Sequence, residues 1–201
     1  MMNLLVKEPK TKRGLNTLNR ICDSARKLFY EKGYYNTSIN DITDGANIAP
    51  GTFYIYFNDK INLYKYLLLQ YSHDIRKTIG VAIEKCDTRY EKERVGLKTF
   101  LEYIRTHKNA YHIIWESLYI DYELFKEYYI NFGLRYTKGL CVAQHNNEVK
   151  DINPTVLSFM LMGVSNFIGL KYVIFEDGKP FDNIVDQVMD ILENGMFTKS
   201  K

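Results

Sequence analysis

The sequence predicts an all-α protein of about nine helices, and three observations support this prediction. Apolar residues recur with the i, i+3, i+4 spacing of amphipathic helices along most of the 201 residues. Strand-type alternation of apolar and polar residues extends over only a few positions at a time. The chain holds four prolines, and each stands where a helix would begin or a loop would run.

The first helix is expected over residues 16–32, because apolar side chains recur on one face there: Leu18, Ile21, Cys22, Ala25, Leu28 and Phe29. Gly33 follows and suits the left-handed position that commonly ends a helix. Residues 1–13 are polar and basic, and we expect them to be a frayed tail, like residues 198–201.

A second, short helix is expected over residues 38–45, capped by Thr37 or Ser38. Asp41 follows Ser38 by three residues, which is the spacing of a capping box. In that motif each side chain bonds the backbone N–H of the other residue. A tight turn is then expected at Asn47.

A third helix is expected over residues 49–56. Pro50 suits its first position, because the N–H that proline lacks would have no helical partner there. Phe53 and Phe57 are expected on the inner side. Three other side chains of this helix are left to face elsewhere: Thr52, Tyr54 and Tyr56.

A fourth, long helix is expected to begin after a cap at Asn58 or Asp59 and to run to about residue 85. Breaks at residues 151–154 and 176–180 separate later elements. Further helices are expected at about 91–107, 109–118, 121–146, 153–176 and 181–196.

Charge is unevenly distributed along the chain, whose net charge is +3. Residues 1–80 hold twelve Lys and Arg against seven Asp and Glu, and the remainder holds fifteen against seventeen. A basic N-terminal part suits a nucleic-acid partner. The three cysteines are far apart and fit neither a disulfide framework nor a zinc site, so with no secretory signal visible we expect a cytoplasmic protein.

Residues 21–64 carry the most informative pattern, which is helix, short helix, tight turn, short helix and long helix. This is helix-turn-helix geometry with a helix on either side. The third helix begins with small residues, Ala49, Gly51 and Thr52, so its backbone can approach a phosphate or a base edge. The pattern predicts a DNA-binding helix-turn-helix over residues 38–57 within a domain of residues 1–60, followed by a second domain of residues 61–201.

Three motifs in this segment resemble the DNA-binding domain of the TetR family of transcriptional regulators. They are A-x-x-L-F-x-x-K-G-Y at residues 25–34, T-S-I-x-D-I at 37–42 and A-x-I-A-x-G-T-F-Y-x-Y-F-x-x-K at 46–60. The resemblance covers about 45 contiguous residues. It implies a repressor that binds operator DNA as a homodimer and is released when a small molecule enters its C-terminal domain. Whether the effector releases or promotes DNA binding is left open by the sequence.

The resemblance also implies individual DNA contacts. Thr37 or Ser38 would contact phosphate at the start of the second helix, and Lys60 would contact backbone phosphate. Lys12 and Arg13 could reach a neighbouring phosphate or the minor groove. The residues implied at the third helix are Ala49, Pro50, Gly51, Thr52, Tyr54 and Tyr56.

Three positions depart from the common pattern of the family. Pro50 stands where a polar or basic side chain is frequent, Tyr56 replaces a frequent histidine, and Ala49 lacks the usual capping hydroxyl. Base recognition is therefore assigned to Thr52 and Tyr54, with contacts to thymine methyl groups from Ala49, Pro50 and Ile55.

Residues 103–132 are dense in aromatic side chains, which suits core packing and also a cavity for an apolar or aromatic effector with a small polar handle. Our candidates for ligand contact are His112, Trp115, Glu116, Tyr119, Tyr128 and Asn166.

The resemblance places the dimer interface on the last two helices, at about 153–176 and 181–196. Small residues would let the helices approach closely: Gly163, Ser165 and Gly169. The second of these helices carries an apolar stripe, which could instead pack within the monomer: Ile184, Val188, Ile191 and Leu192. Two-fold symmetry would require a pseudo-palindromic operator. The apolar run 156–175 is interrupted by polar residues, so we expect a buried or interface helix there rather than a membrane span.

Enzyme signatures are absent from the sequence. The four histidines have no metal-ligand spacing, and no Ser-His-Asp order, P-loop or Gly-rich dinucleotide motif occurs. We therefore expect no enzyme, no metal and no cofactor. Two alternatives stay open: a ligand-binding or adaptor protein whose helix-turn-helix no longer recognises DNA, and a helical enzyme.

Overall fold

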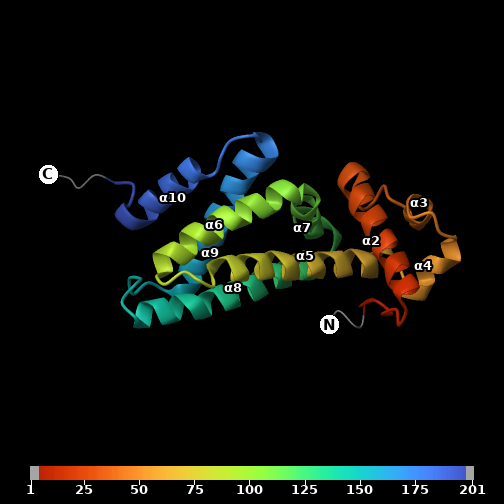
Figure 1. Cartoon of the computed structure of the whole chain (residues 1–201), viewed down its shortest axis with the longest axis horizontal. Coiled ribbons are helices and arrows are strands. Elements are labelled where there is room, and N and C mark those ends of the chain that lie inside the picture. The colour runs from red at the N-terminus through yellow and green to blue at the C-terminus, as the bar shows by residue number, and fades with distance from the viewer. Residues whose placement is uncertain (1–4, 198–201) are drawn as a thin grey trace. The chain divides into compact units, whose positions relative to one another are not determined.

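The computed structural model describes residues 5–197, and within this range the fold is all-α, as expected (Figure 1). Nine α-helices and one π-helical segment follow each other along the described chain. They are α2 (Lys12–Lys32), α3 (Ile39–Gly45), α4 (Pro50–Tyr56), α5 (Lys60–Ile83), α6 (Arg89–Thr106), α7 (Lys108–Ile120), α8 (Tyr122–His145), α9 (Pro154–Gly169), η1 (Leu170–Phe175) and α10 (Asp182–Asn194).

The helices begin and end within a few residues of the predicted positions, except at the N-terminus. There α2 starts at Lys12, where the Thr11 side chain accepts a hydrogen bond from the backbone of the first turn. The expectation of a frayed N-terminal tail is wrong for residues 5–13. Val6 is only 4% exposed, and the Lys7 N–H donates to the carbonyl of Tyr56 at 2.9 Å. The other expected tail, residues 198–201, lies outside the described range.

Contacts divide the chain into two compact units. The first contains the residues up to 74 together with 109–128, and the second contains 75–108 and the residues from 129 onward. Each unit is therefore built from two separate stretches of sequence. The boundary that we assign at residue 60, between a DNA-binding and an effector-binding part, remains a functional prediction.

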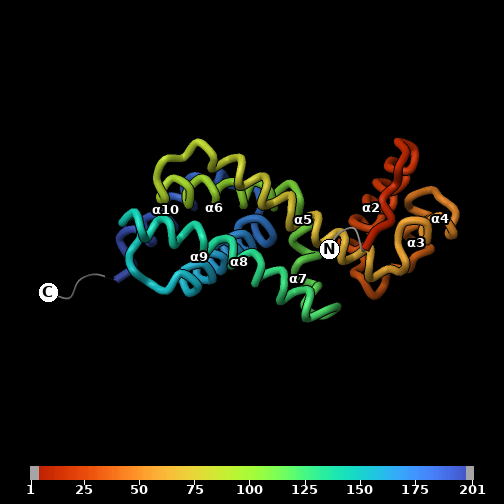
Figure 2. The backbone as a smooth tube through the Cα atoms, turned by 90° about the horizontal axis from the view of Figure 1, so that it is seen from below, coloured from red at the N-terminus to blue at the C-terminus, as the bar shows by residue number. Residues whose placement is uncertain are grey.

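The first unit packs α2, α3 and α4 around the beginning of α5. Phe29, Phe53, Phe57 and Tyr64 are fully buried there, and the rings of Phe29 and Tyr64 meet edge to face. Figure 2 shows α3 and α4 side by side in this unit. The apolar periodicity thus identifies most of this core correctly.

The second unit is built on α6, α8, α9, η1 and α10. Leu140 of α8 packs with Leu157 and Leu161 of α9 in its core. Gly169 is buried against α6, where an added Cβ would lie 2.5 Å from the side chain of Ile104. This close approach assigns Gly169 to packing within the unit and corrects its expected place in a dimer interface.

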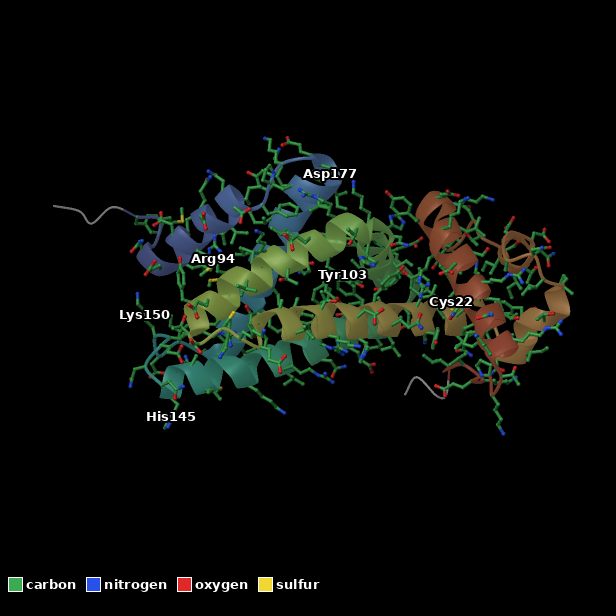
Figure 3. All side chains as sticks on the ribbon, viewed as in Figure 1. Cys22, Arg94, Tyr103, His145, Lys150 and Asp177 are labelled. Atoms are coloured by element: carbon green, nitrogen blue, oxygen red, sulfur yellow. The ribbon has the colours of Figure 1, made fainter. Side chains whose placement is uncertain are left out.

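The helix α10 also packs mainly inward. Val188 is buried and Leu192 packs against the Leu140 cluster, so most of the apolar stripe packs within the monomer. Ile191 is exposed. Ion pairs fasten α10 to α6: Arg94 lies 2.8 Å from Asp186, and Lys98 lies 2.6 Å from Asp182. Figure 3 labels Arg94 on α6 and Asp177 on the segment after η1.

The outer side of α9 is apolar. Residues Pro154–Phe175 form one helical stretch that is long and apolar enough to cross a membrane by length and composition, with 22% of its most apolar window buried. Exposed apolar side chains follow a helical stripe along it: Val156, Met160, Phe167 and Ile174. A surface of this kind commonly marks an interaction site.

We expect acid to weaken the second unit. A hydrogen bond from Lys98 holds the pKa of Asp182 below its usual value, and a hydrogen bond from Lys108 does the same for Asp177. As pH falls, the unfolded chain binds protons at these positions before the folded chain does. Their stabilisation is therefore present above about pH 4 and lost as pH falls through the lowered values.

The measurement is the urea midpoint of unfolding between pH 7 and pH 3. The midpoint should fall at the acid end, and Asp182→Asn should reduce that fall. A midpoint that rises on acidification, or an equal fall in the variant, contradicts the assignment.

Candidate nucleic-acid interface

The helix-turn-helix is formed by α3, a tight turn and α4. Ser38 caps α3, and its capping box with Asp41 is complete in both directions, so Ser38 rather than Thr37 is the cap. Asn47 adopts a left-handed conformation with φ of 51° at the turn, which asparagine tolerates better than most residues. Pro50 then opens α4 at its first position, as predicted.

Polar side chains of α2 hold this turn in place. The Ser24 hydroxyl donates to the carbonyl of Ile42 at 2.8 Å, and the Arg20 guanidinium donates to the carbonyls of Ala46 and Asn47, the latter at 2.7 Å. Neither residue was predicted from sequence to have this role. They are polar positions on an amphipathic helix, and nothing in the local pattern distinguishes them from solvated ones.

The helix α4 has one anchored face and one free face. Phe53 and Phe57 are fully buried, whereas Tyr54 is 51% and Ile55 60% exposed. Thr52 is partly buried. Ala49, Pro50 and Gly51 are exposed as well, and Ala49 makes no side-chain cap, as expected. The exposed surface therefore runs from the start of α4 to Ile55.

Three of the expected DNA contacts turn inward in the structure. Thr37 is fully buried, and its hydroxyl donates to the carbonyl of Gly33 at 2.8 Å. Tyr56 is 7% exposed, and its hydroxyl lies close to Gly14 of α2. The Lys60 ammonium donates to the carbonyls of Tyr34 and Thr37, each at 2.7 Å. This burial and pairing argue against side-chain contact with DNA at Thr37, Tyr56 and Lys60.

The basic residue Lys7 lies beside the C-terminal end of α4. The Lys7 ammonium donates to the carbonyl of Tyr54 at 3.3 Å, which fixes the N-terminal segment beside this helix. Lys10, Lys12 and Arg13 follow along the same segment and are exposed. Cations next to a protruding helix form a surface suited to a polyanion.

The candidate ligand residues of α7 lie on different faces of that helix. Glu116 accepts a hydrogen bond from the backbone N–H of Tyr34 at 2.7 Å, and Tyr119 is exposed with its carbonyl accepting from the hydroxyl of Tyr35. His112 shares this face, one helical turn before Glu116. Trp115 instead lies beside Tyr111, at a ring separation of 6.1 Å.

The candidate ligand residues therefore have different surroundings in the structure. It assigns Glu116 and Tyr119 to contacts with the segment after α2. Trp115 and Tyr128 are partly buried in the first unit. Asn166 belongs to the second unit, where its amide donates to the carbonyl of Met162.

Residues 21–67 match the family described as bacterial regulatory proteins, tetR family. Among curated relatives, the probable HTH-type transcriptional regulator YttP of Bacillus subtilis is 26% identical over 115 residues, which cover 56% of each chain. The chain thus matches about half the length of this relative.

Solved structures resemble the whole fold. The fatty acid degradation regulator FadR from Bacillus halodurans has a TM-score of 0.79 at 16% identity and covers 92% of this chain and 96% of its own. A putative TetR-family regulator from Syntrophomonas wolfei has a TM-score of 0.78 at 21% identity, with coverages of 92% and 98%. FadR from Bacillus subtilis, solved in complex with stearoyl-CoA, has a TM-score of 0.70 at 17% identity, with coverages of 89% and 99%.

At these identities the structural likeness establishes the fold, and the motifs of residues 21–67 supply the more specific relationship. The helix-turn-helix in the structure is the one that the sequence resemblance predicts. The helix-turn-helix segment of the chain, residues 21–67, belongs to the TetR family of bacterial regulatory proteins.

Proposed function

We propose that the chain is a cytoplasmic transcriptional regulator that binds a pseudo-palindromic operator as a homodimer. In this proposal it acts as a repressor, and a small apolar or aromatic effector releases it from DNA. The observation that carries the proposal is the exposed surface of α4. Tyr54 and Ile55 protrude from a helix that Phe53 and Phe57 anchor in the core.

The revised contact surface is smaller than the one expected from sequence. It contains Ser38 at the start of α3 and the exposed residues of α4, with basic residues of the N-terminal segment beside them. In this arrangement phosphate contacts would position the helix-turn-helix on DNA, and contacts from α4 to the bases would specify the sequence. The α4 residues of the surface are Ala49, Pro50, Gly51, Thr52, Tyr54 and Ile55.

Gly51 tests whether α4 has an external partner. Nothing lies within 4 Å of the position that a Cβ would occupy there, so internal packing does not require glycine. Gly51→Ala should leave the free energy of unfolding unchanged or raise it by up to about 1 kcal/mol, because alanine favours a helix. The added methyl group should nevertheless weaken DNA binding, if the backbone of α4 approaches DNA closely.

The measurements for this variant are urea unfolding and fluorescence anisotropy with a labelled operator duplex. Gly80→Ala, at a helical glycine with similarly open surroundings on α5, is the matched control. Unchanged DNA affinity in Gly51→Ala would contradict a close approach at this position.

Dimerisation through α9 would cover the exposed stripe that contains Met160 and Phe167. In this proposal α9 forms most of the dimer interface, as predicted. The helix α10 contributes to the interface only through exposed residues such as Ile191. Gly163 has open space around it and would allow close approach of a second copy. A two-fold axis at α9 would allow the helix-turn-helix segments of two copies to bind one duplex.

Effector binding would act by favouring one of two dimer conformations. The helix α5 extends from Lys60 in the first unit to Ile83 in the second. A shift of this helix would therefore change the distance between the two helix-turn-helix segments of the dimer. The required coupling free energy is about 1–3 kcal/mol. Since a relative of the same fold is solved with stearoyl-CoA, acyl-CoA thioesters are the first apolar compounds to test.

Trp115 is the single tryptophan of the chain and provides the test of the effector site. Stearoyl-CoA or an aromatic compound that binds beside it should change its fluorescence saturably and lower operator affinity. Trp115→Ala should weaken the response to such a compound more than it weakens operator binding. An effector whose binding and action are the same in Trp115→Ala would place the pocket elsewhere.

The experiment that tests the proposed function is selection of bound sequences from a random duplex library by the purified protein. Enrichment of an inverted repeat, with half-site centres about one DNA turn apart, supports the proposal. Recovery of no enriched sequence contradicts it.

A further inference from the structure

The segment that joins α2 to α3 is held by side chains from two other helices of the first unit. The Tyr34 N–H donates to Glu116 Oε1 of α7 at 2.7 Å, and the Tyr34 carbonyl accepts from the ammonium of Lys60 of α5 at 2.7 Å. Both polar groups of one backbone residue are thus satisfied by charged side chains. Hydrogen bonds to charged groups are stronger than those between neutral groups.

The residue before Tyr34 is a glycine, which leaves room for Glu116 to approach this backbone closely. Gly33 has φ of +76°, and an added Cβ would lie 3.0 Å from Glu116 Oε1. A side chain at Gly33 would therefore strain the backbone and press on the carboxylate. The end of α2 and the carboxylate of α7 fit each other at this point.

Lys60 fastens the remainder of the segment. Its ammonium also donates to the Thr37 carbonyl at 2.7 Å and lies 4.1 Å from the ring centroid of Tyr34. The hydroxyl of Thr37 closes the segment by donating to Gly33, and Ser38 then caps α3. A continuous set of hydrogen bonds thus leads from Glu116 to the first residue of the helix-turn-helix.

The second oxygen of Glu116 has no comparable partner. Oε2 is buried, and none of the described residues gives it a hydrogen bond. The nearest basic group is Nε2 of His112, at 3.9 Å. Burying such an oxygen opposes folding, and the negative charge of Glu116, which counteracts the lowering of the Lys60 pKa by burial, offsets part of this cost.

We infer that Glu116 is a positioning residue for DNA binding, which holds the segment 33–37 and thereby sets the direction of α3 and α4. The inference rests on the proposed function and adds a residue on α7 that lies outside the exposed DNA surface. It also gives Glu116 a role different from the effector contact expected from sequence. This role requires one side-chain oxygen at residue 116 that accepts the hydrogen bond from the Tyr34 N–H.

The test compares Glu116→Leu, which removes the acceptor, with Glu116→Gln, whose amide oxygen keeps one. Glu127→Leu, at an exposed carboxylate of α8, is the matched control. Operator affinity should fall on the order of tenfold or more in Glu116→Leu and stay within about threefold of wild type in the other two variants. Backbone hydrogen exchange, read by mass spectrometry, should increase over residues 33–37 in Glu116→Leu alone.

Three results would overturn the inference. They are wild-type affinity in Glu116→Leu, the same loss in Glu116→Gln as in Glu116→Leu, and hydrogen exchange that rises equally throughout the first unit. If the wild-type protein binds no duplex, the proposed function fails. The exchange of residues 33–37 in Glu116→Leu still shows whether the carboxylate holds this segment.

Discussion

Replacing Phe167 with aspartate should convert the proposed dimer into monomers and abolish tight operator binding. Phe167 is 64% exposed at the centre of the apolar stripe on α9, so most of its side chain is accessible to a second copy. Burial of a phenylalanine contributes about 1.5–3 kcal/mol. A two-fold interface contains two copies of Phe167, so the substitution removes this contribution twice. The dimer dissociation constant should therefore rise at least about a hundredfold.

Sedimentation equilibrium measures the oligomeric state, and thermal unfolding at fixed concentration checks that the monomer stays folded. Val81→Asp is the matched control, because Val81 is similarly exposed on α5 and lies outside the α9 stripe. A Phe167→Asp protein that remains a dimer would exclude this face as the interface. The result is independent of whether the operator is known.

Replacing Tyr54 with alanine should weaken operator binding while leaving the fold intact. Half of the Tyr54 side chain is exposed, although its ring touches that of Phe53 edge to face. Loss of one hydrogen bond to DNA costs about 1 kcal/mol in each half-site. Two half-sites give a loss on the order of 30-fold for the dimer.

Fluorescence anisotropy with the selected duplex measures this loss, and circular dichroism checks the helical content. Tyr90→Ala is the matched control, since Tyr90 is exposed on α6 in the second unit. Equal affinity of Tyr54→Ala and wild type would remove Tyr54 from the contact surface. Equal losses in Tyr54→Ala and Tyr90→Ala would indicate an effect that is not specific to α4.

Local chemistry explains why the helices could be predicted from sequence. The capping box at Ser38, the glycine at the end of α2 and the Asn153–Pro154 start of α9 each act within a few residues. The buried phenylalanines of α4 follow from helical spacing alone. Such signals need no knowledge of distant parts of the chain.

The errors came from contacts between segments far apart in sequence. Val6 is buried because the N-terminal segment pairs with the backbone near Tyr56, some fifty residues later. Glu116 and Lys60 meet Tyr34 only after three helices pack together. A polar residue on an amphipathic helix gives no sign, in sequence, of the backbone group that it will bind.

The salt dependence of duplex binding tests the central claim most directly. The N-terminal segments of a dimer would present eight exposed cations, from Lys7, Lys10, Lys12 and Arg13 of each copy. If at least five of them neutralise phosphates, a plot of log Kobs against log salt should have a slope between roughly −4.5 and −7 for the selected inverted repeat. A slope near zero, or equal affinity for a scrambled duplex at every salt concentration, would contradict the assignment of α4 and its basic neighbours as an operator-binding surface.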